Sequence, residues 1–140
     1  SGAFDAEIAP VIVSSRGGDT EVMQDEQPAK ARPDKIPHLR AAFRKDGTVT
    51  AANSSSISDG AAALILARES VAADKGLPIR ARILGHASHA QAPGEFPTAP
   101  VPATEKLLKR LGWAIEDVDL WEVNEAFAVV PMAFMSRLGM

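Results

Sequence analysis

Apolar residues in this chain form short blocks that are separated by polar or proline-rich stretches. Blocks rich in β-branched and aliphatic residues predict strands at residues 8–13, 48–50, 81–90 and 118–123, because such side chains suit a pleated, half-buried surface. The block 61–67 is ambiguous, since its alanines favour a helix whereas Leu64-Ile65-Leu66 suits a buried strand, and periodicity cannot separate the two in so short a run. We favour a strand, followed by a helix at 69–75 that Gly76 ends.

Further helices are predicted toward the C-terminal end. Residues 104–111 have helical spacing, with Leu107, Leu108 and Leu111 on one face and Gly112 just beyond. Residues 126–138 form a longer apolar block that also suits a helix. The alternation of strands and helices predicts an α/β fold with layers and a largely parallel sheet.

Other stretches are predicted to be irregular. Residues 14–35 are polar and contain glycine and proline, which predicts an excursion over the surface. Residues 37–43 suit one or two helical turns. Residues 91–102 are rich in proline, which predicts a loop with fixed backbone angles.

Composition narrows the class of protein. The chain has 140 residues, of which 46% are hydrophobic, and a formal net charge of -3. These values fit a globular protein and give no reason to expect nucleic acid or an anionic membrane surface as a partner. No apolar run reaches the roughly 20 residues of a membrane span. Cysteine is absent, which excludes disulfides, cysteine metal sites and thiol catalysis by these residues.

Asn124 is the strongest candidate for chemistry. It opens the run Asn124-Glu125-Ala126-Phe127-Ala128, at the predicted junction between a strand and a helix. Its uncharged amide could donate to an oxygen that gains negative charge, directly or through a water. Asparagine is also among the preferred N-caps, so the residue alone leaves a catalytic and a capping interpretation open.

The loop at residues 53–60 (NSSSISDG) is the second candidate. Its hydroxyls and its final glycine suit close approach of a ligand to the backbone. The alternative is ordinary turn or capping chemistry, with Ser58 or Asp59 as the cap.

His86 and His89 raise the question of a metal site. They are three residues apart, and side chains with that spacing point to opposite faces of the strand predicted there. We therefore expect no metal.

Taken together, these segments resemble the thiolases, the acyltransferases that form and cleave 3-ketoacyl-CoA. Residues 43–51 (FRKDGTVTA) resemble the stretch that leads into the thiolase motif GTVTAGNAS, and residues 53–63 follow it directly. Residues 98–103, 111–113 and 117–120 continue the resemblance in the same order, and residues 124–128 are similar to the NEAFA motif of the family. The resemblance covers nearly the whole chain and is weakest at residues 14–35.

The resemblance implies a fold of two similar α/β halves with an inserted loop domain that grips coenzyme A. Residues 1–42 would be the end of the coenzyme A-binding loop domain. Residues 43–76 would end the N-terminal half, and residues 80–140 would begin the C-terminal half. The chain is therefore expected to be an internal fragment of a thiolase, and the resemblance adds support for a strand at 61–67.

The resemblance also implies roles for five residues. Asn124 matches the asparagine whose amide holds the water of an oxyanion hole, and Ser55 matches a serine that contacts the pantetheine arm. Phe43 matches an aromatic residue on the wall of the coenzyme A pocket, and Phe127 matches a pocket residue beside the reacting acyl group. Phe96 stands where the family often has a methionine near the acyl chain, so its bulk could alter acyl selectivity.

Thiolases also need a nucleophilic cysteine, a second cysteine that acts as acid and base, and the histidine of a GHP motif. By the resemblance all three would lie outside this chain, so we expect the complete protein to be an acyl-CoA acetyltransferase (thiolase) and the isolated chain to be inactive. The alternative is a non-catalytic thiolase-like protein that binds acyl-CoA or lipid.

The resemblance finally implies partners and location. The substrate would be an acyl-CoA, a thioester of coenzyme A, with no covalently bound cofactor. The complete protein would be a homodimer or homotetramer that binds neither nucleic acid nor membrane. It would be cytoplasmic, or mitochondrial or peroxisomal in a eukaryote.

Overall fold

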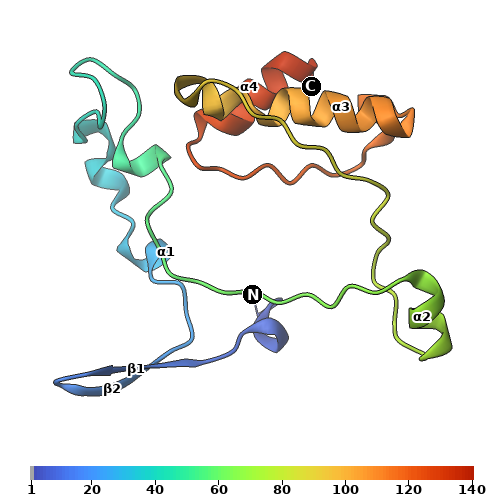
Figure 1. Ribbon diagram of the computed structural model, residues 1–140. Helices are drawn as coiled ribbons and strands as arrows, with labels where there is room; N and C mark the ends of the chain where they lie inside the picture. The colour runs from blue at the N-terminus through green and yellow to red at the C-terminus, as the bar shows by residue number, and fades with distance from the viewer. Residues whose placement is uncertain (1) are drawn as a thin grey trace. The chain divides into compact units, whose positions relative to one another are not determined.

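The computed structural model describes residues 2–140 (Figure 1). The chain divides into two compact units, one that ends at His38 and one that runs from Leu39 to Met140. Within residues 2–140, every helix is too short or too polar to span a bilayer.

The first unit is built around a β-hairpin. Strands β1 (Val11–Ser15) and β2 (Gly18–Val22) pair antiparallel, with Val11 opposite Val22 and Ser15 opposite Gly18. The Ser15 hydroxyl donates to the carbonyl of Gly18 over 2.9 Å, and Gly18 has a φ of +111°, which favours glycine. The other elements are the 3₁₀ helices η1 (Asp5–Glu7) and η2 (Pro33–His38) and the single-turn helix α1 (Gln27–Lys30).

The sequence predicted this unit only in part. The predicted strand at 8–13 begins later, at Val11, because Pro10 lacks the N–H that a strand position needs. Residues 14–35 are all exposed, as predicted, but their irregular backbone is wrong in the first half, which holds the end of β1 and all of β2. Arg16 and Gly17 form the two-residue turn between them. The helical turns predicted at 37–43 lie earlier, in η2.

The second unit carries the longer helices, α2 (Glu69–Asp74), α3 (Pro100–Leu111) and α4 (Val129–Leu138). It also holds the 3₁₀ helices η3 (Ala51–Asn53), η4 (Pro93–Thr98) and η5 (Ile115–Asp117). Glycines in the left-handed conformation follow each of these three α-helices: Gly76 at φ +61°, Gly112 at +68° and Gly139 at +73°. This is the usual left-handed end of a helix, and it confirms the ends predicted at Gly76 and Gly112.

Both α3 and α4 begin at residues that the sequence did not predict. α3 starts at Pro100 and not at residue 104, because a proline in the first turn lacks only an N–H that would have no helical partner. α4 starts at Val129 and not at residue 126. The residues before it are held instead by hydrogen bonds to residues 53–55.

The core of the second unit lies between α3 and α4, which run side by side in Figure 1. Val101 of α3 is 5% exposed, and Val130 and Phe134 of α4 are 4% and 3% exposed. The ring of Trp121 stands edge-on to Phe134, with 5.3 Å between the ring centres. These side chains fix α3 and α4 against the segment that precedes α4.

The segment 81–90 passes close to α3. A Cβ added at Gly85 would lie 3.0 Å from Leu107 and 3.4 Å from Leu111. Two leucines of the predicted apolar face of α3 therefore point toward this segment, and the close approach accounts for a glycine there.

The strands predicted at 48–50, 61–67, 81–90 and 118–123 do not form among residues 2–140. Figure 1 shows the residues on either side of α2 as extended coil. A strand needs a neighbour for its N–H and C=O groups, and these segments have none in the described part of the chain. Leu64, Ile65 and Leu66, whose composition suits a buried strand, are accordingly 88%, 94% and 72% exposed.

Candidate functional site

Two segments that are far apart in the sequence are joined by hydrogen bonds in the second unit. The amide of Ser55 donates to the carbonyl of Ala126 over 3.1 Å, and the amide of Ala128 donates to the carbonyl of Asn53 over 3.0 Å. Ser54 and Phe127 form an antiparallel bridge between these bonds. The pairing brings together the two candidate motifs that the sequence presented separately.

The first of these segments is shaped by its own side chains. The carboxamide oxygen of Asn53 accepts from the amide of Thr50 over 2.7 Å, and its nitrogen donates to the carbonyl of Thr48 over 2.9 Å. The Ser54 hydroxyl donates to the carbonyl of Thr50 over 2.7 Å. Capping chemistry is therefore present in the loop, but Thr50 and Asn53 provide it, not Ser58 or Asp59.

Ser55 is the loop hydroxyl that reaches the second motif. Its Oγ donates to the carbonyl of Ala126 over 3.1 Å. Because a hydroxyl has a single hydrogen and two lone pairs, the Oγ remains able to accept a hydrogen bond from a ligand. Ser56 and Ser58 instead bond to each other over 3.0 Å.

Three phenylalanines meet beside this pairing. The ring centre of Phe127 lies 5.9 Å from that of Phe43, in an edge-on arrangement, and 6.3 Å from that of Phe96. Phe43 is 73% exposed and Phe96 is 51% exposed. The cluster thus presents open aromatic surface, and Phe43 also lines a hollow of about 260 Å³ with Arg44, Gly47, Thr48 and Val49.

An open cavity of about 390 Å³ lies next to the aromatic cluster. Its volume is in the range typical of small-molecule sites. Its apolar walls come mainly from Phe96, Pro97, Pro100, Trp121, Val130 and Phe134, and its polar side chains are those of Thr104, Glu122 and Asn124.

Asn124 lies on the wall of this cavity and is exposed. Its amide makes no hydrogen bond to other residues between 2 and 140, and α4 begins five residues later, with Ala128 at the N-cap. The capping interpretation of Asn124 is therefore wrong. The amide can serve a ligand or a water.

All five residues singled out by the sequence thus belong to one neighbourhood. Ser55, Phe43 and Phe127 are linked through the pairing and the aromatic cluster, and Phe96 and Asn124 share the cavity. The sequence analysis did not single out Trp121 as a site residue. The available signal was its spacing of two from Val123, because side chains two apart in an extended segment face the same side, and both line the cavity.

Among the described residues, no three His, Asp or Glu side chains are placed to hold a metal ion. His89 contacts Lys106 of α3, whose Nζ lies 3.0 Å from its Nδ1.

Comparison with known proteins identifies relatives over almost the whole chain. The family model described as the N-terminal domain of thiolase matches residues 1–70, and that of the C-terminal domain matches residues 77–140. A protein of Dictyostelium discoideum named "Probable acetyl-CoA acetyltransferase" is 52% identical over 134 residues, which are 95% of this chain and 32% of that protein. Relatives from Gibberella zeae and Xenopus laevis carry the word mitochondrial in their names.

Solved structures of thiolases are also similar to this chain. The Bacillus anthracis acetyl-CoA acetyltransferase is 40% identical with a TM-score of 0.90, over 99% of this chain and 36% of that one. The Ascaris suum Acat5 thiolase, solved in complex with coenzyme A, is 40% identical with a TM-score of 0.87, over 99% of this chain and 35% of that one. The likeness confirms the thiolase-like α/β fold class, and the chain spans about a third of the length of the relatives it matches.

Proposed function

The chain belongs to the thiolase family, and on that premise we propose that it is part of an acetyl-CoA acetyltransferase that forms or cleaves 3-ketoacyl-CoA through a cysteine acyl-enzyme. The observation that carries the proposal is the pairing of residues 53–55 with residues 126–128. It sets Ser55 and the aromatic cluster beside a cavity that has the Asn124 amide on its wall. In this proposal, residues 1–42 end the coenzyme A-binding loop domain, 43–76 end the N-terminal half and 80–140 begin the C-terminal half.

Asn124 is proposed as the residue that stabilises charge in the reaction. Carbon–carbon bond formation or cleavage next to a thioester places negative charge on a carbonyl oxygen, and an amide N–H aimed at that oxygen, or at a water bound to it, lowers the barrier. The uncommitted amide of Asn124 at the cavity wall supports this role.

Ser55 and Phe43 are proposed to hold the coenzyme A part of the substrate. The Ser55 hydroxyl hydrogen is already bonded to Ala126, so its oxygen is suited to accept from an amide N–H of the pantetheine arm. The exposed ring of Phe43 and the hollow beside it offer apolar surface for the same arm.

Phe127 and Phe96 are proposed to line the place of the acyl group. Phe96 is the aromatic residue of the cluster that also lines the cavity. Because its ring fills space that a more flexible side chain would leave adaptable, its bulk is expected to influence which acyl groups are accepted.

The thiol chemistry must come from other residues, since the chain has no cysteine. We propose that the nucleophilic cysteine, the acid/base cysteine and the catalytic histidine belong to the remainder of a longer protein. That protein would be a homodimer or homotetramer located in the cytoplasm, or in mitochondria or peroxisomes of a eukaryote.

The test is an assay of the complete protein for coenzyme A-dependent cleavage of acetoacetyl-CoA. Turnover that falls on Asn124→Ala supports the proposal. Binding of acetoacetyl-CoA without turnover would instead favour the alternative, a non-catalytic acyl-CoA-binding protein.

A further inference from the structure

A chain of side-chain hydrogen bonds runs from α3 to η4. The ammonium of Lys106 lies 3.0 Å from Nδ1 of His89, and Nε2 of His89 lies 3.2 Å from Oε1 of Gln91. The amide nitrogen of Gln91 donates to Oγ1 of Thr98 over 2.7 Å and also to the carbonyl of Glu95. His89, Gln91 and Thr98 are all half-buried.

The chemistry of the donors allows one assignment of protons along this chain. Lysine can only donate, so Nδ1 of His89 accepts and the ring hydrogen of a neutral imidazole stands on Nε2. That N–H donates to Oε1 of Gln91, which leaves the Gln91 amide nitrogen facing Thr98 and Glu95 as a donor. Thr98 completes the chain because its own hydroxyl donates to the carbonyl of Glu95 over 3.0 Å.

The chain of hydrogen bonds ends on the helical turn that carries Phe96. Within η4 the carbonyl of Glu95, one residue before Phe96, accepts from both Gln91 and Thr98. η4 has six residues and contains Pro97, and short 3₁₀ helices have weak hydrogen bonds of their own. The side-chain bonds therefore supply much of what fixes this turn, and with it the ring of Phe96 in the cavity.

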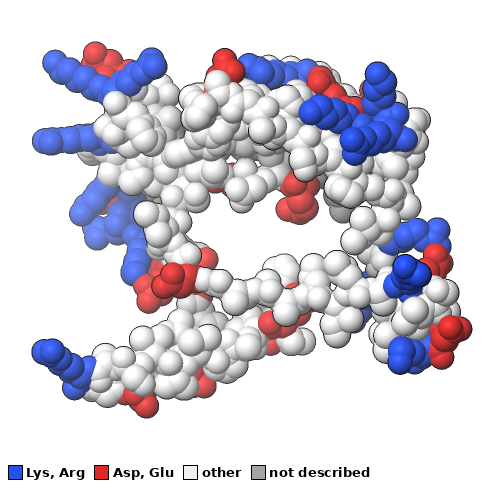
Figure 2. All heavy atoms as spheres, in the orientation of Figure 1, with Lys and Arg blue, Asp and Glu red and all other residues white. Residues whose placement is uncertain are grey.

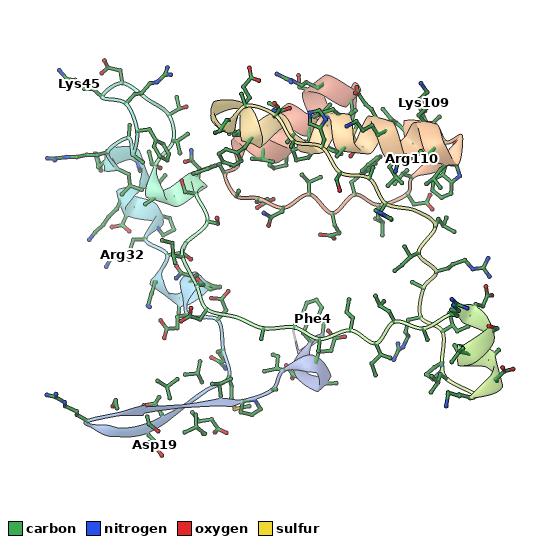
Figure 3. All side chains as sticks on the ribbon, in the orientation of Figure 1. Phe4, Asp19, Arg32, Lys45, Lys109 and Arg110 are labelled. Atoms are coloured by element: carbon green, nitrogen blue, oxygen red, sulfur yellow. The ribbon has the colours of Figure 1, made fainter. Side chains whose placement is uncertain are left out.

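The other end of this chain of hydrogen bonds is anchored on α3. Lys106 also donates to the carbonyl of Ser88 over 3.3 Å, and Arg110, one turn later, donates to the carbonyl of His86 over 2.9 Å. Figure 2 shows basic side chains gathered over α3, and Figure 3 shows Arg110 beside the segment before η4 and Lys109 pointing away from it. Two of the basic residues of α3 thus act as donors to residues 86–89.

We propose that His89 and Gln91 are positioning residues, which hold η4 and Phe96 in place. His89 is the link to α3, through the 3.0 Å contact between its Nδ1 and the ammonium of Lys106, and Gln91 is the link to η4. Lys106 is the charged group that faces the ring from α3, while Glu95 of η4 takes part through its backbone carbonyl. Removing either side chain therefore breaks the link between α3 and η4.

Hydrogen exchange of the complete protein tests the positioning without any assay of activity. The amides of Glu95 and Ala99 close η4, donating to Ala92 and Phe96 over 2.8 and 3.0 Å. We expect their protection, corrected for the intrinsic effect of pH, to fall about fivefold in His89→Ala and in Gln91→Ala, the equivalent of one hydrogen bond.

His86→Ala is the matched control, because His86 takes part only through its backbone carbonyl. A second pair tests the far end of the chain with minimal change of shape: Thr98→Val removes the hydroxyl and Thr98→Ser restores it. The proposal is overturned if protection at η4 is the same in the unmodified protein, in His89→Ala and in Thr98→Val.

The consequence for substrates rests on the proposed function and has its own readout. We expect His89→Ala and Phe96→Ala to shift the ratio of kcat/KM for acetoacetyl-CoA and 3-ketohexanoyl-CoA in the same direction, and His86→Ala to leave it unchanged. If exchange at η4 responds and the ratio does not, the positioning of η4 stands and the acyl role proposed for Phe96 fails.

Discussion

The carbonyl oxygen of Ala126 accepts two hydrogen bonds from Ser55, one from the backbone amide and one from the hydroxyl, each of 3.1 Å. One residue of the serine-rich loop is thereby fixed against the segment that carries Asn124 and Phe127. The position of Ser55 is therefore coupled to the geometry of the aromatic cluster and the cavity.

Ser55→Ala in the complete protein should weaken binding of acyl-CoA. The change removes one hydrogen bond within the protein and the acceptor proposed for the pantetheine arm, so we expect KM for acetyl-CoA to rise about fivefold or more and stability to fall by about 1 kcal/mol. Steady-state kinetics and thermal unfolding measure the two effects. Ser56→Ala is the control, since the Ser56 hydroxyl bonds only to Ser58 among the described residues, and an equal rise of KM in both variants would count against the assignment.

Asn124→Ala should lower turnover and leave stability unchanged. Loss of one donor to a developing oxyanion costs on the order of 3 kcal/mol, a factor of about a hundred in kcat. Because the amide neither caps α4 nor bonds to another described residue, the melting temperature should stay within a degree or two, in contrast with the loss of about 1 kcal/mol expected for a cap. A variant that melts lower but turns over normally would sink the catalytic role.

Asn53→Ala should behave in the opposite way to Asn124→Ala. The Asn53 side chain bonds to Thr50 and Thr48, so its removal should cost about 1–2 kcal/mol of stability. Measuring kcat and the melting temperature of both asparagine variants side by side separates structural from catalytic amides.

Phe134→Ala should destabilise the complete protein strongly. Phe134 is 3% exposed and packs against Trp121, and truncation of a buried phenylalanine typically costs about 3–5 kcal/mol. Met132→Ala on the same helix is the control, because Met132 is 62% exposed, and denaturant unfolding should show a loss below about 1 kcal/mol for it. Similar losses in both variants would contradict the packing described for α4.

The isolated 140-residue polypeptide should have no thiolase activity. It contains no cysteine and so cannot form the thioester intermediate. Coenzyme A-dependent cleavage of acetoacetyl-CoA by rigorously purified polypeptide would overturn this expectation.

The isolated polypeptide should also self-associate. Leu64, Ile65 and Leu66 are exposed on a segment whose backbone has no strand partner among residues 2–140, and unpaired apolar segments of this kind promote association. Analytical ultracentrifugation that shows a compact monomer, together with cooperative thermal unfolding, would count against this.

The sequence was most informative where local chemistry decides the structure. Gly76 and Gly112 end their helices because only glycine adopts a positive φ without strain. The presence of glycine at these positions is visible directly in the sequence. The start of α4 could not be predicted in the same way, because residues 126–128 are drawn into bonds with residues 53–55. The spacing of apolar residues contains no information about a hydrogen-bond partner so distant in the sequence.

The same distinction applies to the site. The motifs singled out Asn124 and Ser55. The sequence cannot distinguish an asparagine that caps a helix from one whose amide is free, so the capping interpretation could be tested only against the observed start of α4. The His89–Gln91–Thr98 chain was not anticipated either, because each member is an ordinary polar residue until η4 and α3 bring them together.

The bond between Ser55 and Ala126 joins residues 71 positions apart, and this has a consequence for biosynthesis. Closing a loop of that length costs about 4 kcal/mol of chain entropy, which local contacts cannot offset before both ends exist. At about 5–20 residues per second, a ribosome takes roughly 4–14 s to add the intervening residues. During that interval the serine-rich loop is already inside the exit tunnel or beyond it, without its partner. The pairing of residues 53–55 with residues 126–128 therefore forms late in translation. A slow codon or a chaperone acting between these two positions would change when the pairing forms without altering any residue that takes part in it.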